Sequence, residues 1–200
     1  YSEPGVWFEY VLDTARLVQK AGLKNVLVTN GYLEAAPLKE LLPYIDALNI
    51  DLKAFNNDFY RTVCGGSLNE VLRTVEIAAA KCHVEITTLL VPTLNDDCRE
   101  IKELAKWLKV IDENIPLHFS RYFPQYKMPL PPTPLETLNQ AAQIAREELK
   151  YVYLGNIGSV NTYCPDFSFL LVDRASFASF LTPENKCPNC GAELKNFVTT

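Results

Sequence analysis

Two groups of residues in this 200-residue sequence have types and spacings that could support chemistry. Asp51 and Lys53 lie two positions apart at the end of an apolar run, so in an extended strand both side chains point to the same side. They form either a surface ion pair, which contributes ~0–1 kcal/mol, or a cationic site for an anionic ligand. Cys187 and Cys190 have the C-x-x-C spacing of metal ligands. The sequence therefore predicts one candidate site in the middle of the chain and a second near its end.

The elements that position these residues alternate between helical and extended patterns. A helical apolar face covers 6–21, and short apolar runs predict strands over 25–29, 45–52, 84–91, 115–121 and 151–154, with helices between them. Ser67 with Glu70, and Thr133 with Glu136, are expected to form capping boxes at two helix starts. Repeated strand–helix units with short connections indicate parallel strands and right-handed crossovers.

This pattern fits an α/β fold, either a barrel or an open doubly wound sheet. The chain opens on a helix whose preceding strand we expect upstream of Tyr1, so we favour a partial (βα) barrel. That barrel would cover 1–158, and 159–200 would form a small separate tail.

The composition argues against two classes of protein. The net charge of −5, the pI near 5.1 and the absence of a dense Lys/Arg run argue against nucleic-acid binding. No apolar run reaches the ~18 residues that a membrane span needs, so we expect no membrane partner. No secretory signal is visible, and we therefore expect a cytoplasmic protein whose six cysteines stay reduced.

Polar residues gather where the predicted strands end, which is the ligand face of parallel α/β folds. These groups lie at 29–31, 51–53, 92–95, 120–122 and 155–156. Each has an ordinary interpretation as well, because Asn30-Gly31 is a common turn and a histidine within a strand, such as His118, is more often a hydrogen-bonded core residue than a catalyst. Their clustering at one rim is more informative than any single residue.

Together these motifs resemble the radical S-adenosylmethionine (SAM) superfamily, and within it the pyruvate formate-lyase-activating type. The nearest pattern is that of the AmmeMemoRadiSam system radical SAM enzymes. The likeness covers nearly the whole chain and is carried by YSEP at 1–4, VTNGY at 28–32, NIDLKAF at 49–55, LHFSRYFPQYKM at 117–128, NTYCP at 161–165 and KCPNCG at 186–191.

The resemblance implies roles at the matching positions. Glu3 stands at the glutamate of a Gly-Gly-Glu motif that holds the amino group of SAM, and Asn30 lies at a SAM-contacting strand end. Asp51 and Lys53 match an Asp-x-Lys motif whose lysine meets the SAM carboxylate. Arg121 falls near a position where activating enzymes carry a cofactor-contacting histidine.

One departure from the family pattern concerns the [4Fe–4S] cluster. The C-x-x-x-C-x-x-C loop that holds it does not occur in this sequence, and we expect it before Tyr1 in the full-length protein. Cys64, Cys82 and Cys98 are too widely separated to replace it, and we expect them to be buried or incidental thiols. The chain alone is therefore expected to be inactive in radical chemistry.

The second departure lies in the tail, where the family has a zinc ribbon with two C-x-x-C pairs. Here the first pair reads Cys164-Pro165-Asp166-Phe167, so a phenylalanine stands at the expected cysteine. Cys164, Cys187 and Cys190 remain as three thiolates for zinc, and Asp166 could supply a fourth ligand. The alternative is a degenerate ribbon without metal, held together by packing of Phe167, Phe169, Leu170 and Phe177.

The leading hypothesis is that the full-length protein cleaves SAM reductively and abstracts hydrogen from a substrate. That substrate would be a protein, such as a glycyl-radical-type enzyme, or another molecule. A second hypothesis is a cluster-less module that binds SAM or a protein without catalysis. A remote third is an aldolase-like barrel in which Lys53 forms a Schiff base and Asp51 moves the proton.

Overall fold

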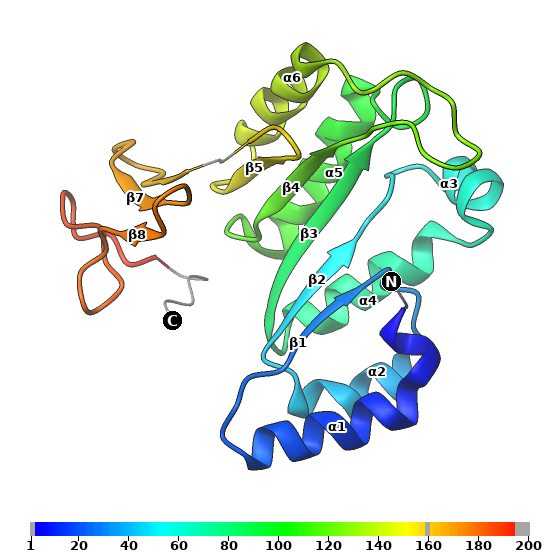
Figure 1. The fold of residues 1–200 in the computed structure, drawn as a ribbon, viewed down its shortest axis with the longest axis horizontal. Coiled ribbons are helices and arrows are strands. Elements are labelled where there is room, and N and C mark those ends of the chain that lie inside the picture. The colour runs from blue at the N-terminus through cyan, green and yellow to red at the C-terminus, as the bar shows by residue number, and fades with distance from the viewer. Residues whose placement is uncertain (1–2, 159–160, 195–200) are drawn as a thin grey trace.

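The computed structural model describes residues 3–158 and 161–194 and contains five parallel strands that follow one another in chain order (Figure 1). All helices longer than one turn place their buried residues in one apolar cluster with one face of this sheet. A doubly wound sheet reverses its strand order and carries helices on both faces, whereas a barrel does neither. The fold is therefore part of a (βα) barrel. The strands are β1 (Val26–Thr29), β2 (Ala47–Asp51), β3 (His83–Leu90), β4 (Leu117–Arg121) and β5 (Val152–Gly155).

The helices lie close to the positions predicted from apolar periodicity. A short segment that the periodicity did not predict, α3 and the π turn η3, follows β2. No helix in the described ranges is both long and apolar enough to cross a membrane. The bounds are η1 (Pro4–Trp7), α1 (Phe8–Lys20), α2 (Ala35–Leu41), η2 (Leu42–Tyr44), α3 (Asn57–Phe59), η3 (Tyr60–Cys64), α4 (Leu68–Ala79), α5 (Cys98–Asp112) and α6 (Leu135–Arg146).

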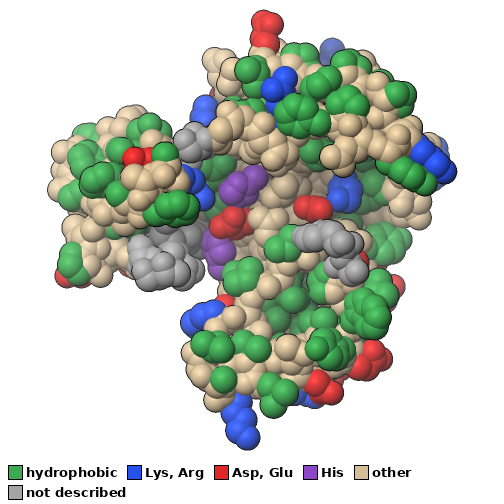
Figure 2. Space-filling view, in the orientation of Figure 1, with side chains coloured by type: hydrophobic (Ala, Val, Ile, Leu, Met, Phe, Trp, Pro, Cys, Tyr) green, Lys and Arg blue, Asp and Glu red, His purple; other side chains and the backbone are tan. Residues whose placement is uncertain are grey.

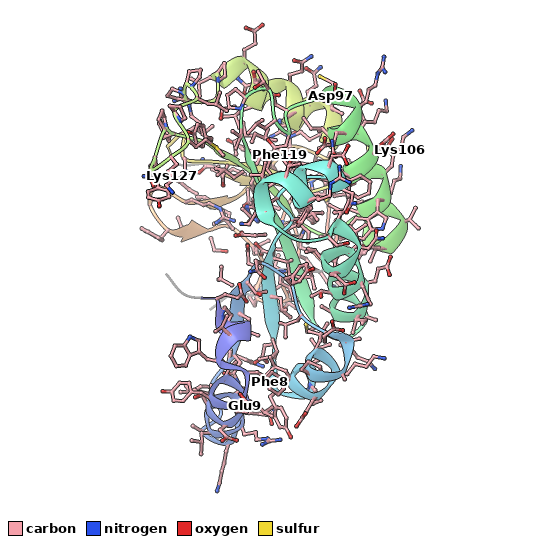
Figure 3. The ribbon with its side chains drawn as sticks, turned by 90° about the vertical axis from the view of Figure 1, so that its right-hand side faces the viewer. Phe8, Glu9, Asp97, Lys106, Phe119 and Lys127 are labelled. Carbon is pink, nitrogen blue, oxygen red and sulfur yellow. The ribbon has the colours of Figure 1, made fainter. Side chains whose placement is uncertain are left out.

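Alternation along the strands separates the two faces of the sheet. Leu48 and Ile50 of β2 are buried against the helices. Phe119 of β4, labelled in Figure 3, is fully buried in the same cluster, and α5, which carries the labelled Lys106, lies to the right of the strands in that view. Burying a side chain of this size stabilises the fold by ~1.5–3 kcal/mol. The intervening residues, such as Asn49 and Asp51, are only partly buried and face the open side. The core thus fixes which residues can meet a ligand.

The predicted helix starts are correct, but the capping-box hydrogen bonds are absent. Ser67 precedes α4 without a side-chain cap, and the amide of Leu68 instead donates to Oδ1 of Asn57 at 3.1 Å. The hydroxyl of Thr133 donates to the carbonyl of Leu90 at 2.6 Å and accepts from the amide of Tyr122 at 3.0 Å. The prediction failed because the amide of Leu68 and the hydroxyl of Thr133 have partners on other segments that local sequence does not reveal.

The tail forms a small antiparallel sheet of β6 (Thr162–Tyr163), β7 (Leu170–Asp173) and β8 (Ala178–Ser179). Its apolar cluster includes Tyr151 and Tyr153, so it packs on the β5 edge of the barrel sheet. Phe167 and Phe177 are 62% and 93% exposed, so these two side chains do not pack the tail as the alternative of a metal-free ribbon requires. Of the predicted boundary and motif residues, 1, 2, 159 and 160 lie outside the described ranges.

Candidate functional site

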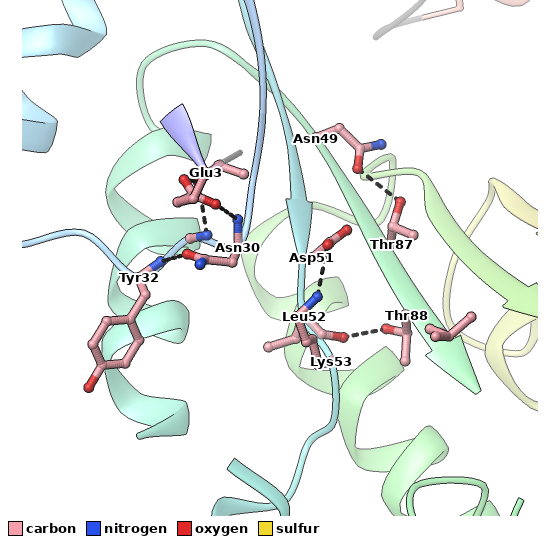
Figure 4. Close-up of polar contacts among 12 residues, drawn as sticks. Glu3, Asn30, Tyr32, Asn49, Asp51, Leu52, Lys53, Thr87 and Thr88 are labelled. Carbon is pink, nitrogen blue, oxygen red and sulfur yellow. Dashed lines mark hydrogen bonds and ion pairs between the residues drawn. The ribbon is translucent and has the colours of Figure 1, made fainter. Parts of the chain in front are cut away.

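The end of β1 is tied to the N-terminal segment by the carboxylate of Glu3. Its Oε2 accepts from the amide of Asn30 at 2.7 Å, and its Oε1 accepts from the hydroxyl of Thr29 and the amide of Gly5 (Figure 4). Gly31 has a φ of 71°, and a Cβ there would lie 2.7 Å from Ile50. The Asn30-Gly31 turn is therefore required by close packing and not only by turn preference.

At the end of β2, Lys53 is held from two directions. Its Nζ lies 2.9 Å from Oδ2 of Asp51, which confirms that these side chains share one side of the strand. Its amide donates to the hydroxyl of Tyr60 at 3.1 Å, and its carbonyl accepts from Nδ2 of the buried Asn95 at 2.6 Å. Burial raises the pKa of Tyr60, which keeps that phenol neutral. Tyr60, which sequence patterns did not select, and Asn95, which belongs to the predicted polar group at 92–95, thus position the backbone at Lys53.

A cavity of 460 Å³ opens between these strand ends and brings Asn30 and Lys53 together. This volume is in the range of small-molecule sites. Aromatic and apolar side chains complete the wall, among them Tyr32, Tyr60, Leu89, Tyr122 and Met128, together with the thiol of Cys64.

Three of the predicted cofactor residues do not line this cavity. Glu3 and Asp51 lie beside it through the contacts described above. Arg121 is engaged elsewhere, because its Nε donates to the carbonyl of Thr133 at 2.8 Å and its guanidinium lies 4.9 Å from the ring centre of Phe123. The structure therefore brings Asn30 and Lys53 together and leaves Arg121 outside the group.

The open face of the sheet carries a second polar group. Asp51, Thr87, His118 and Tyr153 pair in register across β2, β3, β4 and β5, so they form one row. The ring of His118 stacks on Tyr153 with 5.1 Å between centroids. Neighbouring strands lie ~4.8 Å apart, which places this row within a substrate's length of the Lys53 cavity.

Glu85 links the two histidines on this face (Figure 2). Its Oε2 lies 2.7 Å from Nε2 of His118, and its Oε1 lies 3.1 Å from Nε2 of His83. Burial opposes ionisation of Glu85, but the hydrogen bonds and charges of the two imidazoles hold the pKa of this carboxyl well below its usual range. An ionised carboxylate only accepts hydrogen bonds, so each imidazole donates to Glu85 through its Nε2.

The histidine–glutamate group depends on strand register, and the only local pattern that pointed to it is the alternation that places His118 on the open face of its strand. His118 is half-buried, so the ordinary interpretation of it as a core residue is incomplete.

The three predicted metal ligands converge in the tail. The sulfur atoms of Cys164, Cys187 and Cys190 all lie within 4.8 Å of one another, and Cys164 and Cys187 are buried. Among the described residues, no carboxylate or imidazole joins this group, and Asp166 is therefore not a fourth ligand in this arrangement. Cys64 and Cys98 are exposed instead of buried.

Comparison with known proteins identifies the family. Residues 1–108 match the model of the radical SAM superfamily. The chain belongs to the radical SAM superfamily. An uncharacterized protein of Methanocaldococcus jannaschii shares 40% identity with this chain. The alignment covers 97% of this chain and 61% of that relative. Pyruvate formate-lyase 1-activating enzyme of Escherichia coli K12 shares 29% identity with this radical SAM chain. That alignment covers 50% of this chain and 42% of the enzyme.

Solved structures support the same fold. A domain of pyruvate-formate lyase-activating enzyme from Bacteroides vulgatus aligns with 78% of this chain and 96% of its own, with a TM-score of 0.68 and 22% identity. This likeness concerns the fold alone. The radical SAM chain spans less than two thirds of the two curated relatives described above.

Proposed function

We propose that this chain is the SAM-binding part of a radical SAM enzyme of the pyruvate formate-lyase-activating type. The observation that carries the proposal is the 460 Å³ cavity in which Asn30 and Lys53 meet at adjacent strand ends, with Glu3 and Asp51 beside it. SAM offers a carboxylate, an ammonium, ribose hydroxyls and an adenine. The ammonium of Lys53 complements the carboxylate, and the apolar wall suits the adenine.

Glu3 can serve the amino group of SAM without giving up its structural contacts. Its carboxylate accepts three hydrogen bonds, from Gly5, Thr29 and Asn30, and a carboxylate has about four acceptor positions. One position therefore remains for an ammonium. The Asp51 carboxylate orients Lys53 so that its Nζ stays near the cavity.

The described cysteines do not fit a [4Fe–4S] cluster, because the three that converge belong to the tail and no C-x-x-x-C-x-x-C loop occurs in the sequence. Radical chemistry is therefore proposed only for the full-length protein, where SAM would be cleaved and hydrogen abstracted from a protein or other substrate. A glycyl-radical-type enzyme is one such protein. The substrate would lie over the row of Thr87 and His118 that adjoins the cavity. The six free thiols support a cytoplasmic location.

Isothermal titration of this chain with SAM tests the binding proposal. We expect Lys53→Ala to weaken SAM binding ~10–100-fold, because a charged hydrogen bond contributes ~1.5–3 kcal/mol. Lys102→Ala is the matched control, since Lys102 pairs with Glu147 on the surface, and it should bind like the wild type. The proposal is wrong if the wild type binds no SAM or if both variants bind equally well.

Catalysis needs a separate test with the full-length protein reconstituted with iron and sulfide. Formation of 5′-deoxyadenosine on reduction would support the enzyme. SAM binding in a protein that never takes up iron would instead favour a cluster-less binding module. The family membership does not support the Schiff-base alternative. Borohydride trapping of a carbonyl substrate on Lys53 would be the evidence in its favour.

A further inference from the structure

The tail contains two turns with the same backbone geometry. In the turn that starts at Cys187, the amide of Gly191 donates to the carbonyl of Cys187 at 2.8 Å. In the turn that starts at Cys164, the amide of Ser168 donates to the carbonyl of Cys164, also at 2.8 Å. Gly191 and Ser168 both have positive φ, at 73° and 51°. Each turn is therefore closed by its fifth residue in the left-handed region.

The match extends one residue further in each turn. The amide of Cys187 donates to the carbonyl of Ala192 at 3.0 Å, and the amide of Cys164 donates to that of Phe169 at 2.7 Å. The two turns thus correspond position by position in their hydrogen bonds, and Phe167 stands at the position that Cys190 has in the other turn. The backbone of a four-cysteine site is complete, although one of its four thiols is missing.

The phenylalanine does not fill the missing ligand's place. Phe167 is 62% exposed, whereas Cys164 and Cys187 are buried beside the apolar residues Leu171 and Leu194. Its neighbour Asp166 lines a groove of 770 Å³ between the tail and the ends of α5 and α6. In residues 161–194, three sulfurs lie within 4.8 Å of one another and no fourth protein ligand joins them.

We propose that Cys164, Cys187 and Cys190 bind one zinc ion. No protein atom occupies its fourth coordination position, which would hold a water molecule that an external thiolate can replace. Zinc is tetrahedral, and sites with three protein ligands keep the fourth position for water or a substrate. A sphere of three thiolates favours another soft ligand over water. Exchange releases the water and sends the thiol proton to solvent, so no oxidant or reductant is required.

The experiment uses this chain loaded with Co²⁺ in place of Zn²⁺ under anaerobic conditions, with metal content measured in parallel. One metal per chain and a visible ligand-field spectrum that shifts when 2-mercaptoethanol is added, with the metal retained, are the expected results. Cys190→Ser should lower metal affinity at least 10-fold, the lower end of the effect of disturbing a metal site.

Phe167→Cys is the decisive variant, because it restores the second C-x-x-C pair. Its spectrum should match that of four thiolates and should not respond to 2-mercaptoethanol. Phe167→Ala, which keeps the gap, should respond like the wild type, and Phe177→Cys is the control for a new thiol elsewhere on the tail. The proposal is overturned if the wild type binds no metal, if its spectrum ignores the thiol, or if Phe177→Cys abolishes the response as Phe167→Cys does. None of these results depends on SAM chemistry.

Discussion

The barrel sheet and the cysteine tail are stabilised on different scales. The sheet and its helices share one large apolar cluster with buried side chains from β2 to β5, and Leu27 of β1 packs against it. The tail's cluster has six buried residues, of which two are cysteines and two are Tyr151 and Tyr153 from the barrel side. A unit with so small a core usually needs a metal, a disulfide or a partner surface to fold. The comparison shows that the proposed ligand residues contribute differently to folding in the two regions.

In the barrel part, the proposed ligand residues are carried by a fold that does not need them. Asn30, Asp51 and Lys53 lie at strand ends beyond the buried positions, so exchanging them should alter binding and leave folding nearly intact. In the tail, Cys164 and Cys187 belong to the core itself. Loss of the bound metal should therefore unfold the tail.

Metal removal should give the largest effect and would separate the two regions directly. Structural zinc contributes ~10–16 kcal/mol to the folding of zinc-finger peptides at pH 7. A chelator is therefore expected to abolish amide-exchange protection over 162–194 while 26–155 keeps its protection. The measurement is hydrogen exchange read by mass spectrometry. Equal amide-exchange protection of 162–194 with and without chelator would show that the tail, like the barrel sheet, folds without metal.

Truncation of the barrel core is expected to have the next largest effect. Phe119→Ala should destabilise the chain by ~3–5 kcal/mol, because it opens a cavity at a fully buried position. Phe177→Ala in the tail is the matched control and should change stability by less than ~0.5 kcal/mol, since its ring is exposed. Urea unfolding measures both. Similar losses for the two variants would contradict the placement of the core.

Glu85→Gln tests whether the polar group on the open face contributes to stability. We expect a loss of about 1–2 kcal/mol near pH 7, at the low end for charged hydrogen bonds because the side chain is 34% exposed. The folded-state pKa of Glu85 is lowered, so its contribution is present above the ordinary carboxyl pKa of ~4.3 and is lost as the pH falls through the folded value.

The difference between wild type and Glu85→Gln should therefore shrink below pH ~4. Urea unfolding across pH 3–7 measures it, with Glu147→Gln, which breaks a surface ion pair, as control. A difference that stays constant below pH ~4 would show that the histidines do not lower the pKa of this carboxyl.

The smallest effect concerns Cys64, which lines the proposed SAM cavity. Although Cys64 is exposed as a whole residue, partial desolvation by the atoms around its sulfur raises the pKa of this thiol and the charge of Lys53 acts in the opposite direction, so alkylation should accelerate as the pH rises. SAM at five times its Kd should slow iodoacetamide modification of Cys64 about sixfold. Cys98, exposed at the start of α5 and outside that cavity, should react at an unchanged rate. Equal protection of both thiols would place SAM elsewhere.

Sequence patterns predicted more of the fold than of the sites. Apolar periodicity located the five strands and the main helices, because burial in a single core dictates that periodicity. It did not predict α3 and the π turn, which place Tyr60 under Lys53. The short spacing of Asp51 and Lys53 sufficed to predict their contact, since both lie on one strand.

Contacts between distant segments could not be predicted in this way. The link from Glu85 to His118 requires the register of β3 and β4, and the hydroxyl of Thr133 was assigned to a helix cap although it joins two strands. In the tail, the resemblance identified the three cysteines as candidate ligands. Only the structure showed that the side chain of Phe167 is exposed.

The strand order has a consequence for synthesis of the chain. Each strand from β2 to β5 pairs with the strand that precedes it in the sequence, so no pairing waits for a distant segment. During translation, every new strand–helix unit can dock on an edge that has already emerged from the ribosome. Each pairing joins residues 21 to 36 positions apart, so the sheet can grow from β1 to β5 without closing a loop longer than one strand–helix unit.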